Sequence, residues 1–408
     1  MPPRRRTAAA RAALRRILTA CNRDVVLVGL LVLAGTAYRE PFAFAHPQFW
    51  AEDGPVFFAE AFTEGWRAFL QPYAGYLHLY PRAIAALAVH LPIQSIPAVF
   101  LAGNVMAQMG VAWLCLSPRL PMSRWAKIAA GAAVALAPAQ NEVFNKLVNS
   151  QWILGLMLLL IIALDPPRTR RQAIGDGALL ALGGLTGPFS VIFLPLFLAQ
   201  GLLRRSRHSW ELFGVALLCA LLQLRHLEFS RTKGTLAWSV DFLRSINGVF
   251  GHMVAGTHGR PAPAGMLVNL AISGLAVLAT MLIAYGALRH RRWISLVFLA
   301  GGIGVIAATM YAFKYDPTPL VGGGDRYWYI PTVAFTWAVI GLWDATAPPS
   351  LRIAIVSVLA LMVASFLQDP HSLPAAAFDE HWEVASRCIG REHPCVIPVN
   401  PGWTFSIP

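Results

Sequence analysis

Charge is what this sequence has least of. Only 13% of its 408 residues are charged, while 56% are hydrophobic. A soluble globular protein carries about twice that charged fraction. The apolar residues fall mostly in long runs separated by short Arg-rich loops, whereas a soluble core gives shorter and more periodic runs. The sequence therefore argues against an ordinary soluble domain and predicts an all-α fold, a polytopic transmembrane helical bundle.

Repeats and nucleic-acid-binding patterns are also missing. We find no internal repeat, low-complexity segment or heptad array in the chain, so repeat architectures are not indicated. The net charge of +13 comes from Arg in short loops, not from a basic patch with interleaved aromatic residues. Such loops are expected to face the cytoplasm. We therefore expect no nucleic acid among the partners.

The first 23 residues are basic and precede an apolar run from Val25 to Ala37. This start could be a cleaved signal peptide, because the sequence FAFA ending at Ala45 offers a cleavage site. Arg39 and Glu40 lie between the run and that site, and the chain beyond it is itself apolar. We favour an uncleaved first span.

Lys and Arg orient the expected crossings. Residues 1–23 would be a cytoplasmic N-terminus, residues 24–367 a membrane domain of about 11 spans, and residues 368–408 an extracytoplasmic tail. The inner segments then hold 20 of the 33 Lys and Arg residues but only 5 of the 20 Asp and Glu residues. The spans are expected at 24–40, 97–116, 126–139, 152–164, two within 176–202, 211–227, 266–288, 294–312, 329–343 and 352–367. The main outer loops are 41–96, 138–151, 228–265 and 313–328.

Two apolar segments do not suit a simple crossing. Residues 80–92 would form a helix only about 18 Å long, too short for a hydrocarbon core of about 30 Å. We expect this helix to lie on the membrane surface. Residues 176–202 could be one long span or two short ones that turn at Gly187 and Pro188. The hairpin keeps both Arg-rich flanks inside and is preferred.

Two of the five cysteines lie in the C-terminal tail, which the charge pattern puts in an oxidising compartment. We predict a disulfide bond between Cys388 and Cys395, with two free thiols as the alternative. Their spacing is not a zinc signature, because no second pair of ligands accompanies them.

Acids, bases and aromatic residues from three outer loops are expected to share the outer face. A carboxylate can take a proton from an attacking hydroxyl, an Arg or Lys can hold a phosphate, and aromatic rings stack on sugars. Two acids could instead hold a divalent cation, so a metal remains open. The residues are Glu52, Asp53, Tyr73, Tyr76, His78, Arg82, Glu142, Asn145, Lys146, Lys314, Asp316, Asp325, Arg326 and Tyr327.

Four short stretches among these loops resemble the GT-C superfamily of membrane glycosyltransferases. WAEDG (50–54) matches the acidic motif that follows the first span in that family. PYAGYLHLYPRAIAALA (72–88) looks like its surface-helix segment, and NEVFNKLVNSQW (141–152) like its second outer loop. GGDRYWYIP (323–331) is similar to a late outer loop that carries a phosphate-binding Arg.

The resemblance implies an enzyme of the plasma (inner) membrane. It would move a sugar from a polyprenyl phosphate to an envelope glycan, lipid or protein acceptor on the outer face, with inversion. Asp53 would be the base, Glu52 its partner or an alternative base, and Arg326 the phosphate ligand. The second loop has a lone Glu142 where the family often has a pair. The remaining substrate-binding residues would be Tyr73, Tyr76, His78, Arg82, Glu142, Lys146 and Tyr327.

Other interpretations of these residues stay open. Asp53 could cap a local helix that has Pro55 at its first position. His78 could be a packed interfacial residue, and Arg82 could anchor the surface helix at the headgroups. A transporter or flippase for a lipid-linked glycan would place ionisable residues deep within the spans, where they are scarce here. A non-catalytic subunit of an envelope assembly is the third possibility.

Overall fold

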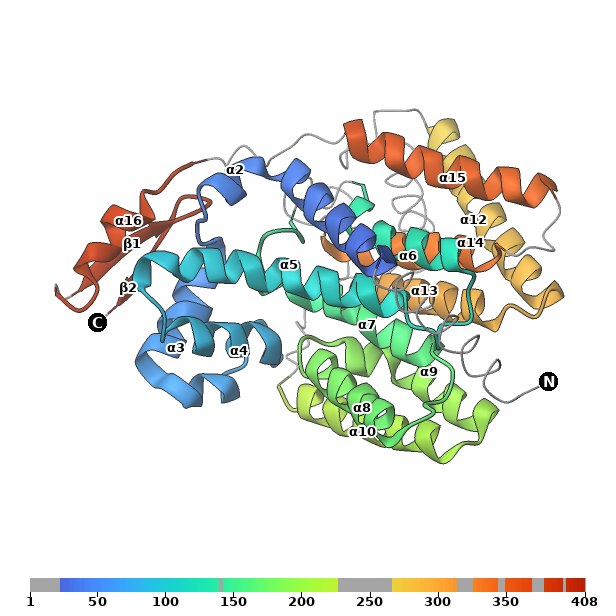
Figure 1. Ribbon diagram of the computed structural model, residues 1–408, viewed down its shortest axis with the longest axis horizontal. Helices are drawn as coiled ribbons and strands as arrows, with labels where there is room; N and C mark the ends of the chain where they lie inside the picture. The colour runs from blue at the N-terminus through green and yellow to red at the C-terminus, as the bar shows by residue number, and fades with distance from the viewer. Residues whose placement is uncertain are drawn as a thin grey trace, which may run out of the picture.

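A computed structural model of the protein describes residues 23–138, 142–226, 266–313, 326–343, 349–368, 378–391 and 394–407. Over these residues the chain is mostly helical, as expected. Long helices lie side by side, and a small β-hairpin packs at one end (Figure 1). This hairpin is a departure from the all-α prediction.

The described helices begin and end close to the expected spans. Ser123, Thr169 and Ser206 each cap a helix by accepting a hydrogen bond from a main-chain N–H three residues on. The first helix covers 23–39. The others are α5 Ile96–Cys115, α6 Arg124–Leu136, α7 Ser150–Ala163, α8 Arg170–Gly184, α9 Phe189–Arg204, α10 Arg207–Leu224, α12 Met266–Arg289, α13 Trp293–Phe313, α14 Arg326–Gly341 and α15 Pro349–Gln368.

Only some of these helices are long enough to cross a membrane. Among the described residues, Ile93–Cys115 and Trp293–Ala312 are long and apolar enough to cross one. The apolar helices Leu147–Ala163 and Phe189–Arg204 are shorter. The 14-residue α7 rises only about 21 Å, below the ~30 Å of a hydrocarbon core. The number of crossings is therefore not established by helix length.

Helix α7 is the centre of the main core. Every one of its residues is buried, and it contacts α5, α8, α9, α13 and α14. Its composition explains this position, because Leu, Ile and Met surround the whole helix and leave no polar face. The start of α7 is thereby held firmly, which matters for the site described below.

The chain from Arg170 to Arg204 forms two helices joined by a turn, as the preferred hairpin predicts. Helix α8 ends at Gly184 and α9 begins at Phe189. Gly187 lies between them at a φ of +92°, a conformation that glycine adopts at little cost. Most of residues 80–92 also form a helix, α4 Leu79–Ala88; its place on a membrane surface stays a prediction.

The segment between the first helix and α5 is a series of short helical turns, joined to the C-terminal tail. Phe49, Phe58 and Phe100 pack with Trp382 and Phe405 of the tail in a second apolar core. The turns are α2 Pro41–Ala45, η1 Ala51–Asp53, the π-helical turn η2 Gly54–Phe58, α3 Ala59–Glu64, η3 Gly65–Leu70 and η4 Ile93–Ser95. The tail contains α16 Trp382–Ala385, η7 Ser386–Cys388, β1 Cys395–Val399 and β2 Trp403–Ile407.

The tail is closed and anchored by specific contacts. Cys388 and Cys395 form a disulfide bond, as the sequence predicts. Strands β1 and β2 pair antiparallel, with Cys395 opposite Ile407. The main-chain N–H of Ala51 donates to the carbonyl oxygen of Asn400, just after β1. The tail therefore holds the segment that carries Glu52 and Asp53.

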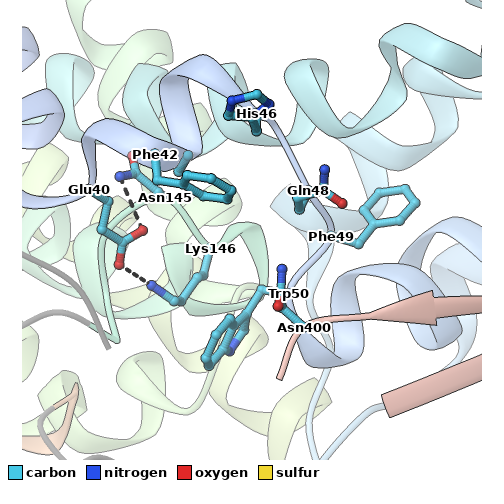
Figure 2. Close-up of a pocket in the computed structure, with 10 residues that line it drawn as sticks. Glu40, Phe42, His46, Gln48, Phe49, Trp50, Asn145, Lys146 and Asn400 are labelled. Atoms are coloured by element: carbon cyan, nitrogen blue, oxygen red, sulfur yellow. Dashed lines mark hydrogen bonds and ion pairs between the residues drawn. The ribbon is translucent and has the colours of Figure 1, made fainter. Parts of the chain in front are cut away.

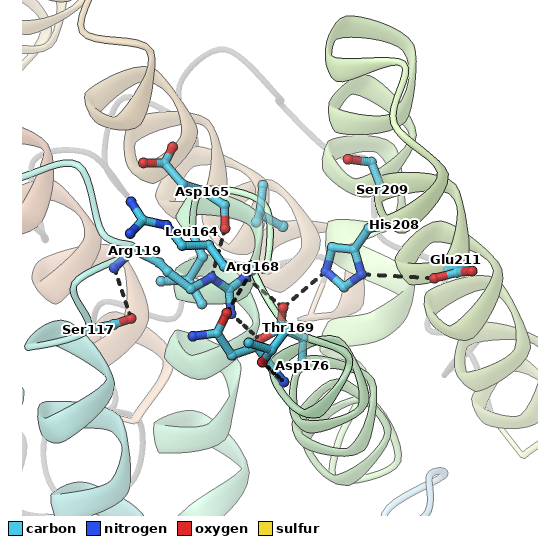
Figure 3. Close-up of polar contacts among 12 residues, drawn as sticks. Ser117, Arg119, Leu164, Asp165, Arg168, Thr169, Asp176, His208, Ser209 and Glu211 are labelled. Atoms are coloured by element: carbon cyan, nitrogen blue, oxygen red, sulfur yellow. Dashed lines mark hydrogen bonds and ion pairs between the residues drawn. The ribbon is translucent and has the colours of Figure 1, made fainter.

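A buried polar cluster joins the helices at the other end of α7 (Figure 3). The guanidinium of Arg119 makes two hydrogen bonds to Asp176, at 2.9 and 2.7 Å, and its Nε donates to the carbonyl of Asp165. The Nε2 atom of His208 lies 3.0 Å from the same Asp176 carboxylate. Paired charges of this kind tolerate burial because their hydrogen bonds are satisfied. The cluster ties α8 and α10 to the loop after α5.

Candidate functional site

Asp53 joins two loops that are far apart in the sequence. It is 2% exposed, and its carboxylate accepts hydrogen bonds from the N–H groups of Leu147 (3.1 Å) and Val148 (2.8 Å). These residues form the short helix η5 Leu147–Asn149, which leads directly into α7. Burial raises the pKa of Asp53 to about 7, against the lowering effect of the two hydrogen bonds. Asp53 therefore caps a helix, but that helix is η5, 94 residues further along the chain, and not the local helix that begins near Pro55.

Glu52 points to a different set of partners. Its carboxylate accepts a hydrogen bond of 2.8 Å from the hydroxyl of Tyr73, and the residue is only partly buried. Tyr73 and Tyr76 are the ends of a tight turn, in which each donates its N–H to the carbonyl of the other. Ala74 and Gly75 between them both have positive φ, at 51° and 82°, as a type I′ turn requires. This turn keeps the two tyrosines beside each other.

The turn between α8 and α9 is hydrogen-bonded to the chain directly after these tyrosines. The carbonyl of Leu77 accepts the N–H of Gly187, and the N–H of Leu79 donates to Leu185. The amide of Gln223, on α10, bonds both the N–H and the carbonyl of Leu77. The turn at Gly187 and Pro188, for which the sequence indicates no further role, therefore positions the segment that carries Tyr76.

Glu142 and Arg326 meet from the second and the last outer loops. The Nη1 atom of Arg326 lies 3.5 Å from Glu142 Oε1. The same guanidinium packs 5.2 Å from the ring centroid of Tyr327. Tyr76 lies within electrostatic reach of Arg326, Tyr327 and Glu52. These contacts bring together six of the predicted site residues: Glu52, Tyr73, Tyr76, Glu142, Arg326 and Tyr327.

Gln151 and Trp152, at the start of α7, complete the group and were not singled out from the sequence. Gln151 Nε2 donates to the Tyr76 hydroxyl at 3.3 Å, and the rings of Trp152 and Tyr327 are perpendicular at 5.1 Å. Gln151 is the last residue of the predicted loop 138–151 and Trp152 follows it, which was the available signal. We call the whole set the Glu52 cluster: Glu52, Tyr73, Tyr76, Glu142, Gln151, Trp152, Arg326 and Tyr327.

Three polar atoms of the Glu52 cluster are buried without a hydrogen-bond partner among the described residues. They are Glu142 Oε2, Gln151 Oε1 and Trp152 Nε1. Unpaired buried polar atoms are costly, so native proteins keep few of them without a reason.

His78 and Arg82 adjoin the Glu52 cluster: His78 packs against Tyr76, and Arg82 pairs with Glu60. His78 is 1% exposed and packs 4.8 Å from Tyr76 and 5.4 Å from Phe57, measured between ring centroids. Burial, helped by the charge of Arg82, lowers the pKa of His78 to about 3. Arg82 is bound to Glu60 and to the carbonyl of Gln71. Both ring nitrogens of His78 are buried without a hydrogen-bond partner within the described ranges, so the structure leaves its predicted role, and that of Arg82, as predictions.

Lys146 belongs to a separate small pocket (Figure 2). It pairs with Glu40, and its ammonium group lies 4.8 Å from the centroid of Trp50. Asn145 Nδ2 donates to the same Glu40 carboxylate at 3.3 Å. Lys146 is thus engaged in a buried ion pair, and its contact with a substrate stays a prediction.

No group of three or more His, Cys, Asp or Glu side chains that could hold a metal occurs within the described ranges. Three predicted site residues, Lys314, Asp316 and Asp325, lie outside them, as does the loop 228–265. In the part that is described, Glu52 is engaged by Tyr73 and Glu142 by Arg326.

The Glu52 cluster combines a carboxylate, a guanidinium and aromatic rings within one set of contacts. Such a set can accept a proton, hold an anion and stack against a ring. Comparison of the chain with models of known protein families, with curated proteins and with solved structures finds no match.

Proposed function

We propose that the protein is a multi-pass membrane glycosyltransferase that uses a polyprenyl-phosphate-linked sugar. The N-terminus would be cytoplasmic, and the Glu52 cluster would face the outside of the plasma (inner) membrane. The observation that carries the proposal is a continuous chain of contacts from Glu52 to Arg326. It runs through the Tyr73–Tyr76 turn, the start of α7 at Gln151 and Trp152, and Tyr327. The acceptor would be an envelope glycan, lipid or protein.

Glu52 is a better candidate for the base than Asp53. Both oxygens of Asp53 are held by main-chain donors, whereas Glu52 has one side-chain donor and is partly open. In the proposed reaction an acceptor hydroxyl attacks the anomeric carbon and gives its proton to Glu52. The bond from that carbon to the phosphate oxygen breaks, and the phosphate leaves with the electron pair.

Arg326 is the candidate for binding the leaving phosphate. A guanidinium is always charged and matches phosphate geometry with paired N–H donors. Its partner Glu142 is 3.5 Å away, a distance that permits reorientation toward a second anion. Tyr73, Tyr76, Tyr327 and Trp152 would line the sugar, whose hydroxyls could donate to Gln151 Oε1 and Glu142 Oε2.

The proposal is tested in a strain that lacks the protein. Envelope glycans and polyprenyl-linked sugars are extracted and compared by mass spectrometry with and without the wild-type gene. We expect one sugar to be missing from a glycan in the deletion strain, with its polyprenyl donor accumulating. Loss of a whole glycan with its lipid-linked form trapped inside would instead indicate a transporter or flippase. Unchanged glycans and donors would contradict the proposal and leave a scaffold role.

A further inference from the structure

Four Arg-bearing turns meet at the end of α7 that lies opposite to the Glu52 cluster. Arg119, after α5, donates to the carbonyl of Asp165, after α7. Arg204, at the end of α9, donates to the carbonyl of Leu164 and lies 4.5 Å from the ring centroid of Trp293, which begins α13. We call this end of the bundle, toward the right in Figure 1, the arginine end; its turns are 116–123, 165–169, 205–206 and 290–292.

Positive charge at the arginine end is not balanced by nearby acids. Some of its arginines have carboxylate partners, such as Arg119 with Asp176 and Arg207 with Glu211. The exposed Asp165 offsets one further charge. Such a surplus of one sign attracts anions. Six other arginines are exposed and form no ion pair in the part of the chain that is described: Arg168, Arg170, Arg171, Arg205, Arg289 and Arg291.

Apolar surface directly adjoins these charges. Leu203 is 84% exposed and precedes Arg204 and Arg205 at the end of α9. Leu288 is 65% exposed and precedes Arg289 at the end of α12. A free phosphate or a nucleic acid gains nothing from exposed leucines, whereas a phospholipid has acyl chains that remove them from water. The combination of leucine and arginine therefore favours a lipid as the anion.

Partly exposed tryptophans lie at the same end of the bundle. The guanidinium of Arg124 is 5.1 Å from the ring centroid of Trp125, and Arg204 contacts Trp293 in the same way. Tryptophan is enriched where a membrane meets water, with its ring at the depth of the lipid headgroups. A guanidinium beside such a ring is therefore close to the lipid phosphates. The tryptophans at this end are Trp113, Trp125, Trp210 and Trp293.

Two arginines of the arginine end have left-handed backbone conformations. The φ of Arg205, between α9 and α10, is +49°, and that of Arg291, between α12 and α13, is +53°. Glycine adopts this conformation at less cost and is the usual residue after a helix. The dipole of the preceding helix also favours a cation there, but that effect changes stability and not lipid binding. Glycine at these two positions therefore removes charge without straining the backbone.

We propose that the arginine end binds anionic phospholipids. Their phosphates accept hydrogen bonds from exposed guanidinium groups such as those of Arg205 and Arg291, and their acyl chains lie against Leu203 and Leu288. Clusters of basic residues beside membrane helices recognise anionic lipids in this way. The inference goes beyond the proposed function and does not rest on sugar transfer, because the arginine end contains no residue of the Glu52 cluster.

The test measures lipid binding directly. Full-length protein in a neutral detergent is titrated with phosphatidylglycerol or with phosphatidylcholine of the same acyl chains, and bound lipid is counted by native mass spectrometry. We expect the wild type to bind phosphatidylglycerol more tightly. The double variant Arg205→Gly and Arg291→Gly should weaken that binding about 25-fold, or about fivefold for each arginine, and should melt no lower than the wild type. Arg205→Lys with Arg291→Lys keeps both charges and should retain the preference.

Arg387→Gln with Arg391→Gln is the matched control, because both arginines are exposed in the tail. It removes the same net charge and should bind both lipids like the wild type. Equal binding of the two lipids by the wild type, unchanged binding in the glycine variant, or an equal loss in the tail variant would each overturn the inference. Displacement of phosphatidylglycerol by millimolar glycerol phosphate would show a site for free phosphate rather than lipid, and would also overturn it.

Discussion

The Oδ1 atom of Asp53 lies 2.8 Å from the main-chain nitrogen of Val148, 95 residues further along the chain. This hydrogen bond, with its neighbour to Leu147, fixes the start of α7 against the segment that carries Glu52. Gln151 and Trp152 follow within four residues. The geometry of the Glu52 cluster therefore depends on a carboxylate that need not touch a substrate.

The burial of Asp53 predicts a specific pH dependence. Its pKa is raised to about 7 in the folded protein, compared with about 3.9 in an unfolded chain. The folded state therefore binds the proton more tightly, and this contribution to stability is lost as the pH rises from about 4 to 7. The melting temperature of the wild type should fall relative to that of Asp53→Asn across this range. A constant difference between the two would contradict the assignment.

Gly187→Ala should distort both the turn and the Glu52 cluster. The φ of Gly187 is +92°, and a Cβ there would lie 2.6 Å from Gln151 Oε1. We expect a loss of about 1–3 kcal/mol in the free energy of unfolding, together with lower activity as Gln151 moves away from Tyr76. Gly177→Ala is the matched control, because nothing lies within 4 Å of its Cβ. In that helical position alanine should stabilise the protein by about 0.5–1 kcal/mol. Equal effects of the two substitutions would refute this account of the turn.

Removing the tail disulfide should loosen the segment around Glu52. The Cys388→Ser and Cys395→Ser double variant is expected to lose roughly 2–3 kcal/mol of stability, from the chain entropy of the opened loop. Denaturant unfolding of the purified protein measures this change. A reductant should lower wild-type stability by a similar amount and leave the double variant unaffected. A wild type indifferent to reductant would show that the tail is held without the bond.

Arg326→Gln tests the proposed phosphate ligand. It removes the guanidinium and leaves Glu142, 6% exposed, without its charged partner. We expect sugar transfer to fall by about a hundredfold or more, the range seen when one group that stabilises developing charge is removed. Arg391→Gln, at an exposed position in the tail, should retain full transfer. Similar transfer by both variants would remove Arg326 from the mechanism.

The sequence predicts the helices well and the partners of individual side chains poorly. Apolar runs mark α5 and α13 to within a residue or two, because burial depends mainly on local composition. The turn at Gly187 could also be anticipated from the Gly-Pro pair.

The β-hairpin and the ion pairs depend on contacts across the chain. Nothing near Asp53 indicates that its partners are 94 and 95 residues away. Arg82 and Lys146 have the right chemistry to bind a phosphate. In the structure they form ion pairs with Glu60 and Glu40, which the sequence does not indicate. The structure does bring Tyr73, Tyr76, Arg326 and Tyr327 into one set of contacts, as the sequence predicts.

The most direct test compares Glu52→Gln with Asp53→Asn in the deletion strain. Membrane amounts, melting temperatures and glycan mass spectra are measured for both variants. The account predicts that Glu52→Gln melts like the wild type and restores no sugar, because only the proton acceptor is lost. Asp53→Asn should change stability and should restore sugar in proportion to the folded protein. Full restoration by Glu52→Gln, with no restoration by a well-folded Asp53→Asn, would contradict the account and return the role of base to Asp53.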